Sequence, residues 1–270
     1  MAPGRPHTNP AASDDARGAD GAEEPWYVSA FRGEYRSVYS HRDLPSARRE
    51  VAWLADEILG AAHGRILDLC CGFGRHSLAL RERGLDVVGI DLSADLLVGA
   101  RELPGSERLL AGRLARADMR RLPFGRSAFG AVLNLFTSFG YLGEEGDREV
   151  LDELARVLAP GAVLVMDLMN AESVRAGLVP HSREERDGVV IEAHRALEDG
   201  GRRVTKDVVW HLPDGAVRRW REDVRMYEPA ELDGLLGERG LAVERRVGDF
   251  DGGAYEGRSS RQIVVARRGG

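Results

Sequence analysis

The chain has very few cysteines, and its two cannot form an ordinary disulfide. Cys70 and Cys71 are the only cysteines in 270 residues. Adjacent positions lack both the geometry of a usual disulfide and the spacing of a metal-ligand pair. We therefore expect a protein of a reducing compartment, the cytoplasm, with no metal site.

Long apolar runs are also missing. No stretch approaches the roughly 18 apolar residues that a membrane span needs, and the first residues lack the hydrophobic core of a signal peptide. The sequence therefore predicts no membrane contact.

Positive charge is not in excess either. The formal net charge is −6, and the basic residues are spread along the chain. Such a chain has no general attraction to phosphate backbones, so we expect no nucleic-acid partner. Lys206 is the only lysine among 38 basic residues, an arginine bias that is typical of GC-rich bacterial genomes.

The start of the chain divides into two parts. Residues 1–24 are mostly Ala, Gly, Pro, Asp and Ser, which have little to bury, so we expect a disordered tail. Residues 25–62 are rich in aromatics and then show a helical pattern that opens at Pro45 and Ser46. We expect them to form an N-terminal lid and helix.

The next part of the chain alternates β-rich runs with helical patterns, which is typical of an α/β fold with a parallel sheet covered on both faces. Residues 63–170 are expected to form a cofactor-binding core. A helix is predicted over 147–158, ending before Pro160. The predicted strands are 65–69, 87–90, 115–117, 131–135 and 163–166.

After residue 170 the pattern changes. Three β-rich segments separated by Gly-containing turns predict an antiparallel meander, inserted as a cap over 171–228. Residues 229–270 are expected to complete the core with a helix and two strands. The predicted meander strands are 189–197, 202–212 and 216–226.

The strongest local signal is the turn after the first predicted strand. Gly72 and Gly74 allow backbone to approach a ligand at a helix N-terminus, where an anion is favoured. With Ser77 they also approximate the dinucleotide pattern G-x-G-x-x-G/A, so a nicotinamide-dependent oxidoreductase stays an alternative. Asp91 ends the second strand, where a carboxylate can accept hydrogen bonds from ribose hydroxyls of either cofactor.

Several later segments extend this pattern. Asp118-Met119 precedes Leu122-Pro123-Phe124, and the runs Asn134 to Tyr141 and Val157 to Gly161 follow. With Asp68-x-x-x-Gly72-x-Gly74 and Asp91, the chain from Trp26 to Arg267 resembles class I S-adenosylmethionine-dependent methyltransferases. The resemblance implies a doubly wound, Rossmann-like sheet of strand order 3-2-1-4-5-7-6 with the last strand antiparallel, and S-adenosyl-L-methionine as cofactor.

The resemblance also implies a set of cofactor-binding residues. Gly72 and Gly74 would flank the methionine portion, Asp91 the ribose, and Asp118 with Met119 the adenine. At position 70 the family usually has a glycine, and we expect the small Cys70 to be tolerated there. The set is completed by Asp68, Cys70, Leu92, Asn134 and Phe136, of which Asn134 and Phe136 would face the methionine and the sulfonium.

The aromatic N-terminal stretch resembles the lid of small-molecule N-methyltransferases. Tyr35 and Tyr39 are candidates to close over the cofactor. The alternative is hydrophobic packing of an N-terminal helix.

The predicted cap resembles that of glycine-type and aminosugar N-methyltransferases, where it covers the acceptor and often makes contacts between subunits. We therefore expect a small-molecule acceptor and a possible homodimer or higher homo-oligomer. The run from Gly248 to Tyr255 resembles the closing segment of natural-product N-methyltransferases, with an ordinary hairpin as the alternative. Candidate acceptor residues are Ser138, Tyr141, Asn170, Arg175, Phe250 and Tyr255.

Methyl transfer from a sulfonium depends mainly on positioning and desolvation of the acceptor. No residue stands out as a general base, and the candidates are Tyr39, His41 and His181. An amine needs only to arrive neutral, so N-methylation in bacterial secondary metabolism is the expected reaction. The alternatives are an O- or C-methyltransferase, an oxidoreductase, or a binding protein without catalysis.

Overall fold

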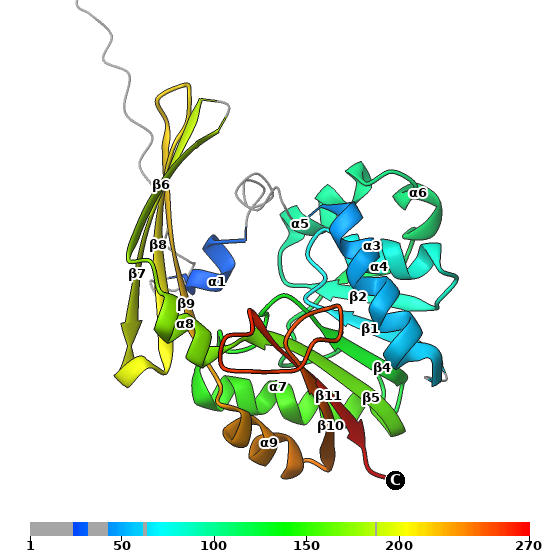
Figure 1. Cartoon of the computed structure of the whole chain (residues 1–270). Coiled ribbons are helices and arrows are strands. Elements are labelled where there is room, and N and C mark those ends of the chain that lie inside the picture. Colours follow the sequence, from blue (N-terminus) through cyan, green and yellow to red (C-terminus); the bar gives the residue numbers. More distant parts are fainter. Residues whose placement is uncertain (1–23, 32–42, 62–63, 187) are drawn as a thin grey trace, which may run out of the picture.

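The computed structural model describes residues 24–31, 43–61, 64–186 and 188–270. A seven-stranded sheet forms its centre, in the order β10-β11-β5-β4-β1-β2-β3 (Figure 1). Strands β1 to β5 run parallel to one another, and β11 is antiparallel to both β5 and β10. Strand bounds are β1 Ile66–Leu69, β2 Val87–Asp91, β3 Leu114–Arg116, β4 Phe129–Asn134, β5 Leu158–Met169, β10 Leu241–Val247 and β11 Arg261–Arg268. Counted within this sheet, the order is 3-2-1-4-5-7-6, which confirms the expected topology.

Helices cover both faces of the sheet because neighbouring strand residues point to opposite sides. Leu133 belongs to the core beneath α3 and α4, whereas Val132 belongs to the core beneath α7 and α9. The covering helices are α3 Leu44–Trp53, α4 Arg75–Glu82, α7 Gly143–Val157 and α9 Pro229–Gly237. The shorter helical segments are α1 Trp26–Ser29, α5 Ala94–Gly99, α6 Ser106–Leu109, α8 Ala171–Gly177, the π-helical η1 Leu54–Ile58, and the 3-10 turns η2 Leu59–Ala61, η3 Ala100–Glu102 and η4 Asp199–Gly201.

Helix α7 ends before Pro160, as predicted, but begins four residues earlier than predicted. The missed turn contains Glu144 and Glu145, whose carboxylates favour a helix N-terminus through the helix dipole. These polar residues carry no apolar periodicity, so the sequence pattern did not reveal them.

The cap has four antiparallel strands, and the prediction of three was wrong. Its order is β6-β7-β8-β9, and Figure 1 shows this sheet standing to one side of the main sheet, with α1 beside β9. The missed edge strand is β6, whose sequence His-Ser-Arg-Glu-Glu-Arg has no apolar alternation. The bounds are β6 His181–Arg186, β7 Val189–Glu198, β8 Arg203–His211 and β9 Val217–Arg225.

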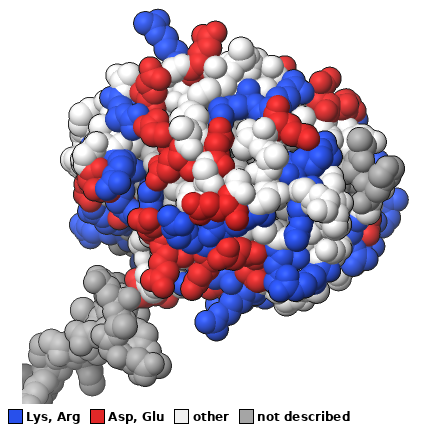
Figure 2. All heavy atoms as spheres, turned by 90° about the horizontal axis from the view of Figure 1, so that it is seen from below, with Lys and Arg blue, Asp and Glu red and all other residues white. Residues whose placement is uncertain are grey.

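Charged side chains of both signs alternate on the face seen from below α9 (Figure 2). Ion pairs join α7 to the end of α9, as between Arg239 and Asp152 over 2.7 Å and between Arg148 and Glu238 over 3.4 Å. Among the described residues, no helix has the length and apolar character that crossing a bilayer requires.

Candidate functional site

The turn that follows β1 is built on left-handed backbone. Cys70, Gly72 and Gly74 have φ angles of 60°, 56° and 76°. A Cβ atom makes this conformation unfavourable. This explains why the resembled family usually has a glycine at position 70. A Cβ on Gly74 would also lie only 3.0 Å from Leu114 Cδ1. The turn therefore packs tightly against β3 and delivers the chain into α4.

Asp68 anchors this turn from inside the sheet. Its side chain is buried, and its Oδ2 accepts a hydrogen bond of 2.6 Å from the Ser77 hydroxyl on α4. Burial raises the pKa of Asp68 above its ordinary value, against the opposing effects of His76, Ser77 and Arg75. The carboxyl thus fixes the start of α4 relative to β1.

Asp91, at the end of β2, is held by backbone donors on both oxygens. The Gly72 amide donates to Oδ2 and the Ser93 amide to Oδ1, each over 2.8 Å. Burial raises the pKa of Asp91, and these two hydrogen bonds oppose that rise. Since a carboxylate oxygen can accept more than one hydrogen bond, both oxygens keep capacity for a ligand hydroxyl.

Asp118 and Met119 follow β3, at the same carboxyl edge of the parallel sheet as Asp91. Arg120 donates to the Asp118 carboxylate, with its Nη2 2.6 Å from Oδ2, and holds the pKa of that carboxyl below its ordinary value. Met119 is buried, and its sulfur lies 3.5 Å from that of Cys70. The third strand is thereby joined to the first turn.

These residues surround one cavity of about 270 Å³ at the carboxyl end of the parallel strands. A ligand site is expected at this edge of an open α/β sheet. Every described residue that lines the cavity falls between Tyr27 and Leu142. The predicted residues among them are Asp68, Cys70, Gly72, Asp91, Leu92, Asp118, Met119, Phe136, Ser138 and Tyr141.

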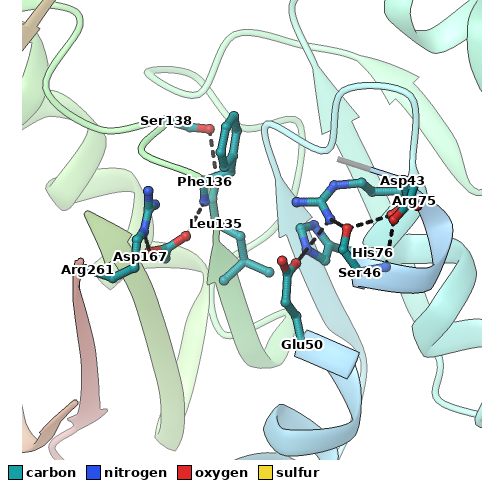
Figure 3. A network of polar contacts seen from close by, with 10 residues as sticks. All are labelled: Asp43, Ser46, Glu50, Arg75, His76, Leu135, Phe136, Ser138, Asp167 and Arg261. Atoms are coloured by element: carbon teal, nitrogen blue, oxygen red, sulfur yellow. Dashed lines mark hydrogen bonds and ion pairs between the residues drawn. The ribbon is translucent and has the colours of Figure 1, made fainter. Parts of the chain in front are cut away.

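A charged group on α3 and α4, which sequence reasoning missed, contributes Arg75 and His76 to another wall of the cavity. Glu50 Oε2 lies 2.5 Å from His76 Nε2 and 3.1 Å from Arg75 Nη1, and Figure 3 shows the three side chains converging. Burial raises the pKa of Glu50, but the hydrogen bond and charge of His76 and the charge of Arg75 outweigh it, so the pKa is lowered.

An aromatic group from the N-terminal segment covers another part of the cavity. The rings of Phe31 and Tyr141 are stacked with centroids 5.7 Å apart, and Trp26 meets Tyr141 at 4.8 Å. Tyr27, Val28 and Phe31 line the cavity. The high density of aromatic residues in this segment predicted a lid, but it did not indicate which residues line the cavity.

Comparisons with known proteins identify the domain that holds these residues. Residues 66–161 match the family described as the methyltransferase domain, a span that holds the turn after β1, Asp91, Asp118 and the segment after β4. The structure of S-adenosylmethionine-bound CalS10, an amino pentose methyltransferase from Micromonospora echinaspora, is 26% identical, covers 87% of this chain and 96% of its own, and superposes with a TM-score of 0.63.

The chain belongs to the class I S-adenosylmethionine-dependent methyltransferases. S-adenosyl-L-methionine is the cofactor of this methyltransferase, which decides between the two nucleotide cofactors that the glycine turn left open.

Two curated relatives differ in how much of their length is matched. A demethylmenaquinone methyltransferase from Clavibacter sepedonicus is 37% identical over 153 residues, which are 55% of this methyltransferase and only 60% of the relative. A dTDP-3-amino-3,4,6-trideoxy-alpha-D-glucopyranose N,N-dimethyltransferase from Streptomyces venezuelae is 28% identical over 196 residues, 66% of this chain and 76% of the relative.

Two predicted cofactor residues do not line the cavity. Gly74 serves as the N-cap of α4. Asn134 ends β4 and is buried, and neither polar atom of its amide has a hydrogen-bond partner among the described residues. An unpaired buried amide is costly.

The other candidate acceptor residues lie at the base of the C-terminal loop or on the cap side. Tyr255 donates to Asn170 Oδ1 over 3.1 Å, and the Asn170 amide donates to the carbonyls of Glu256 and Ser259, each over 2.9 Å. Arg175, in the last turn of α8, pairs with Glu228.

Phe250 and the candidate base His181 do not line the cavity, and the other candidate bases lie outside the described residues. The Phe250 ring packs edge-on against Trp53, at 6.1 Å between centroids. His181 on β6 is paired with His194 on the neighbouring strand β7, with ring centroids 4.5 Å apart. Tyr35, Tyr39 and His41 lie outside the described residues. Within the described ranges, no three His, Cys, Asp or Glu side chains gather as a group that could hold a metal ion.

Proposed function

We propose that this methyltransferase, which acts on small molecules, transfers its methyl group to an amine nitrogen of a secondary metabolite. The activities of the Streptomyces N,N-dimethyltransferase and of CalS10, the latter involved in calicheamicin biosynthesis, support an amine acceptor.

The observation that carries the proposal is that Asp68, Asp91 and His76, all at the cavity, are already bonded to protein groups. Asp68 is bonded to Ser77, Asp91 to two backbone amides, and His76 to Glu50. Each of these three groups therefore already has a protein hydrogen-bond partner. An amine acceptor needs no base if it arrives neutral, whereas a phenol or carbon acceptor usually does.

The geometry also fits the cofactor. The two oxygens of Asp91 can accept the ribose hydroxyls, and the left-handed turn at Cys70 and Gly72 brings backbone to the cavity next to the start of α4, where the carboxylate of the methionine portion would be favoured. Met119 and Leu92 offer apolar surface to the adenine. When bound, the cofactor supplies an electrophilic methyl group on a sulfonium.

Calorimetry with S-adenosylmethionine and S-adenosylhomocysteine tests the cofactor site, and we expect micromolar binding of both. A panel of amines, phenols and carbon acceptors, followed by the mass gain of one methyl group, tests the acceptor. Methylated amines support the proposal. Methylation of phenols or carbon acceptors alone would overturn it, and methylation of a demethylmenaquinone-type acceptor would favour the activity of the Clavibacter relative.

The pH profile gives a second readout. If the amine itself must lose a proton, kcat/KM rises with pH along the acceptor's own pKa, so two amines of different pKa should give profiles displaced by that difference. A profile that stays fixed when the amine is changed would show a base on the enzyme.

A further inference from the structure

Phe136 and Thr137, directly after β4, both have left-handed backbone. Their φ angles are 67° and 55°, in a region where a bulky or β-branched residue is an outlier. Such a conformation persists only where the surroundings over-determine it, and it gathers at functional sites. Since Phe136 lines the cofactor cavity, the groups that hold this pair determine the shape of the cavity wall.

Asp167, near the end of β5, holds both backbone amides. Phe136 N–H donates to Asp167 Oδ2 and Thr137 N–H donates to the Asp167 carbonyl, each over 2.8 Å. The carboxylate is almost completely buried, with 3% of the side chain exposed. It therefore requires a charged partner.

That partner is Arg261, the first residue of β11. Its Nε donates to Asp167 Oδ1 over 2.6 Å, and its Nη2 donates to Thr137 Oγ1 over 2.9 Å. Its guanidinium carbon also lies 5.8 Å from the centroid of the Phe136 ring. One planar fork thus contacts the buried acid, the hydroxyl and the ring at once.

The Phe136 ring has a second guanidinium near it. Arg75 lies 5.9 Å from the ring centroid and is itself held by Glu50 and Ser46. Figure 3 shows the ring between Arg261 on one side and Arg75 on the other. Arg75 begins α4, just after the glycine turn, so the ring stands at the end of the cavity where the methionine portion of the cofactor is expected.

We propose that Arg261 is a positioning residue for the methyl-donor end of the cavity, acting through Asp167 and Thr137 to fix the Phe136 ring. The proposal rests on the proposed cofactor orientation. Lysine cannot replace Arg261, because one ammonium group does not reproduce the planar fork that contacts two acceptors and a ring.

Four variants test the proposal. R261K and T137V each remove the contact between Arg261 and the Thr137 hydroxyl, whereas T137S keeps the hydroxyl and serves as the matched rescue. R267K is the control on the same strand, because Arg267 pairs with Glu244 over 2.7 Å at the surface.

The first readout is hydrogen exchange of the Phe136 and Thr137 amides in the full-length protein. We expect faster exchange in R261K and T137V, and wild-type exchange in T137S and R267K. The second readout is calorimetry with S-adenosylhomocysteine and with adenosine, which lacks the methionine portion. We expect R261K and T137V to lower the affinity for S-adenosylhomocysteine about tenfold and to leave the affinity for adenosine unchanged. The thermal midpoints of both variants should still indicate a folded protein.

Two results would overturn the proposal. One is amide exchange in R261K equal to that in R267K. The other is an equal loss of adenosine and S-adenosylhomocysteine affinity, which would show general loosening of the cavity. If the wild type binds neither ligand, the proposed cofactor orientation fails, and the exchange experiment still decides whether Arg261 holds the Phe136 turn.

Discussion

The backbone amide of Gly72 donates a hydrogen bond of 2.8 Å to the carboxylate of Asp91, so the turn after β1 is fixed to the end of β2. These two residues are expected to bind different parts of one cofactor. Their contact means that the methionine and ribose positions are set together rather than separately.

Replacing Asp91 with alanine should therefore weaken cofactor binding sharply. Hydrogen bonds to a charged acceptor contribute about 1.5–3 kcal/mol, so calorimetry with S-adenosylhomocysteine should show a loss of at least about tenfold. Asp95→Ala is the matched control, because Asp95 lines the same cavity but is exposed on α5. Equal affinity of the wild type and Asp91→Ala would place the ribose elsewhere.

The bond between His76 and Glu50 predicts an acid-sensitive fold. The pKa of Glu50 is lowered from 4.5, so its contribution to stability is present above that value and is lost as pH falls through the lowered pKa. Urea midpoints of the wild type should fall more between about pH 5 and pH 3 than those of Glu50→Gln. Parallel curves for the two proteins would contradict the assignment.

Glu82→Gln provides the control for this pH experiment. The pKa of Glu82 is also lowered, by its hydrogen bond to Arg48, but this pair lies at the surface. Exposed ion pairs contribute little to stability. The pH dependence of Glu82→Gln should therefore stay close to that of the wild type.

The buried bond between Tyr227 and Asp147 predicts a stability loss in Tyr227→Phe. The Tyr227 hydroxyl donates to Asp147 Oδ2 over 2.7 Å, and both side chains are buried. Burial already raises the pKa of Asp147, so losing this donor raises it further. We expect the free energy of unfolding at pH 7 to fall by about 1–3 kcal/mol, and by less in acid, where Asp147 is protonated in either protein.

Tyr255→Phe is the comparison for Tyr227→Phe, because Tyr255 donates to the neutral amide oxygen of Asn170 and is partly exposed. Its loss should be smaller. Urea denaturation of both variants measures the difference, and equal losses would show that the charge of Asp147 is unimportant.

Gly140 should tolerate no side chain. Its φ is 100°, and a Cβ there would lie 2.4 Å from the Arg225 carbonyl oxygen, whereas Gly143, with φ 73°, has open space around it. Gly143→Ala should cost about 1–2 kcal/mol from backbone strain alone. Gly140→Ala should cost about 1–3 kcal/mol more, because the backbone of Arg225 must move. Similar thermal midpoints for the two variants would show that the Arg225 backbone yields easily.

The sequence revealed those parts of the molecule that depend on local patterns. Apolar periodicity and the turn at Gly72 predicted the main strands, and the resemblance supplied their order. The edge strand β6 was not predicted, because its charged sequence has no alternation of apolar and polar residues. The pairs Arg75–Glu50 and Arg261–Asp167 escaped because their members are separated by 25 and 94 residues, and nothing local in either segment indicates the other.

The candidate acceptor residues show the same limit. Ser138 and Tyr141 come from the segment after β4 and line the cavity, since the end of a parallel strand can be located from the sequence. Asn170 and Tyr255 contact each other at the base of a loop. Their role in acceptor binding stays a prediction, because side-chain direction in a turn-rich segment depends on long-range packing.

The described lining of the cavity ends at Leu142, and the chain then adds α7, the cap and three strands of the main sheet, β5, β10 and β11. The residues that line the methyl-donor site and the residues that hold them in place therefore come from different parts of the chain. In a chimera joined near residue 142, we expect donor affinity to follow the first parent, while the second parent alters it only through contacts such as Arg261 with Thr137. Lineages could then diversify the later half of the gene while the methyl-donor site stays constant.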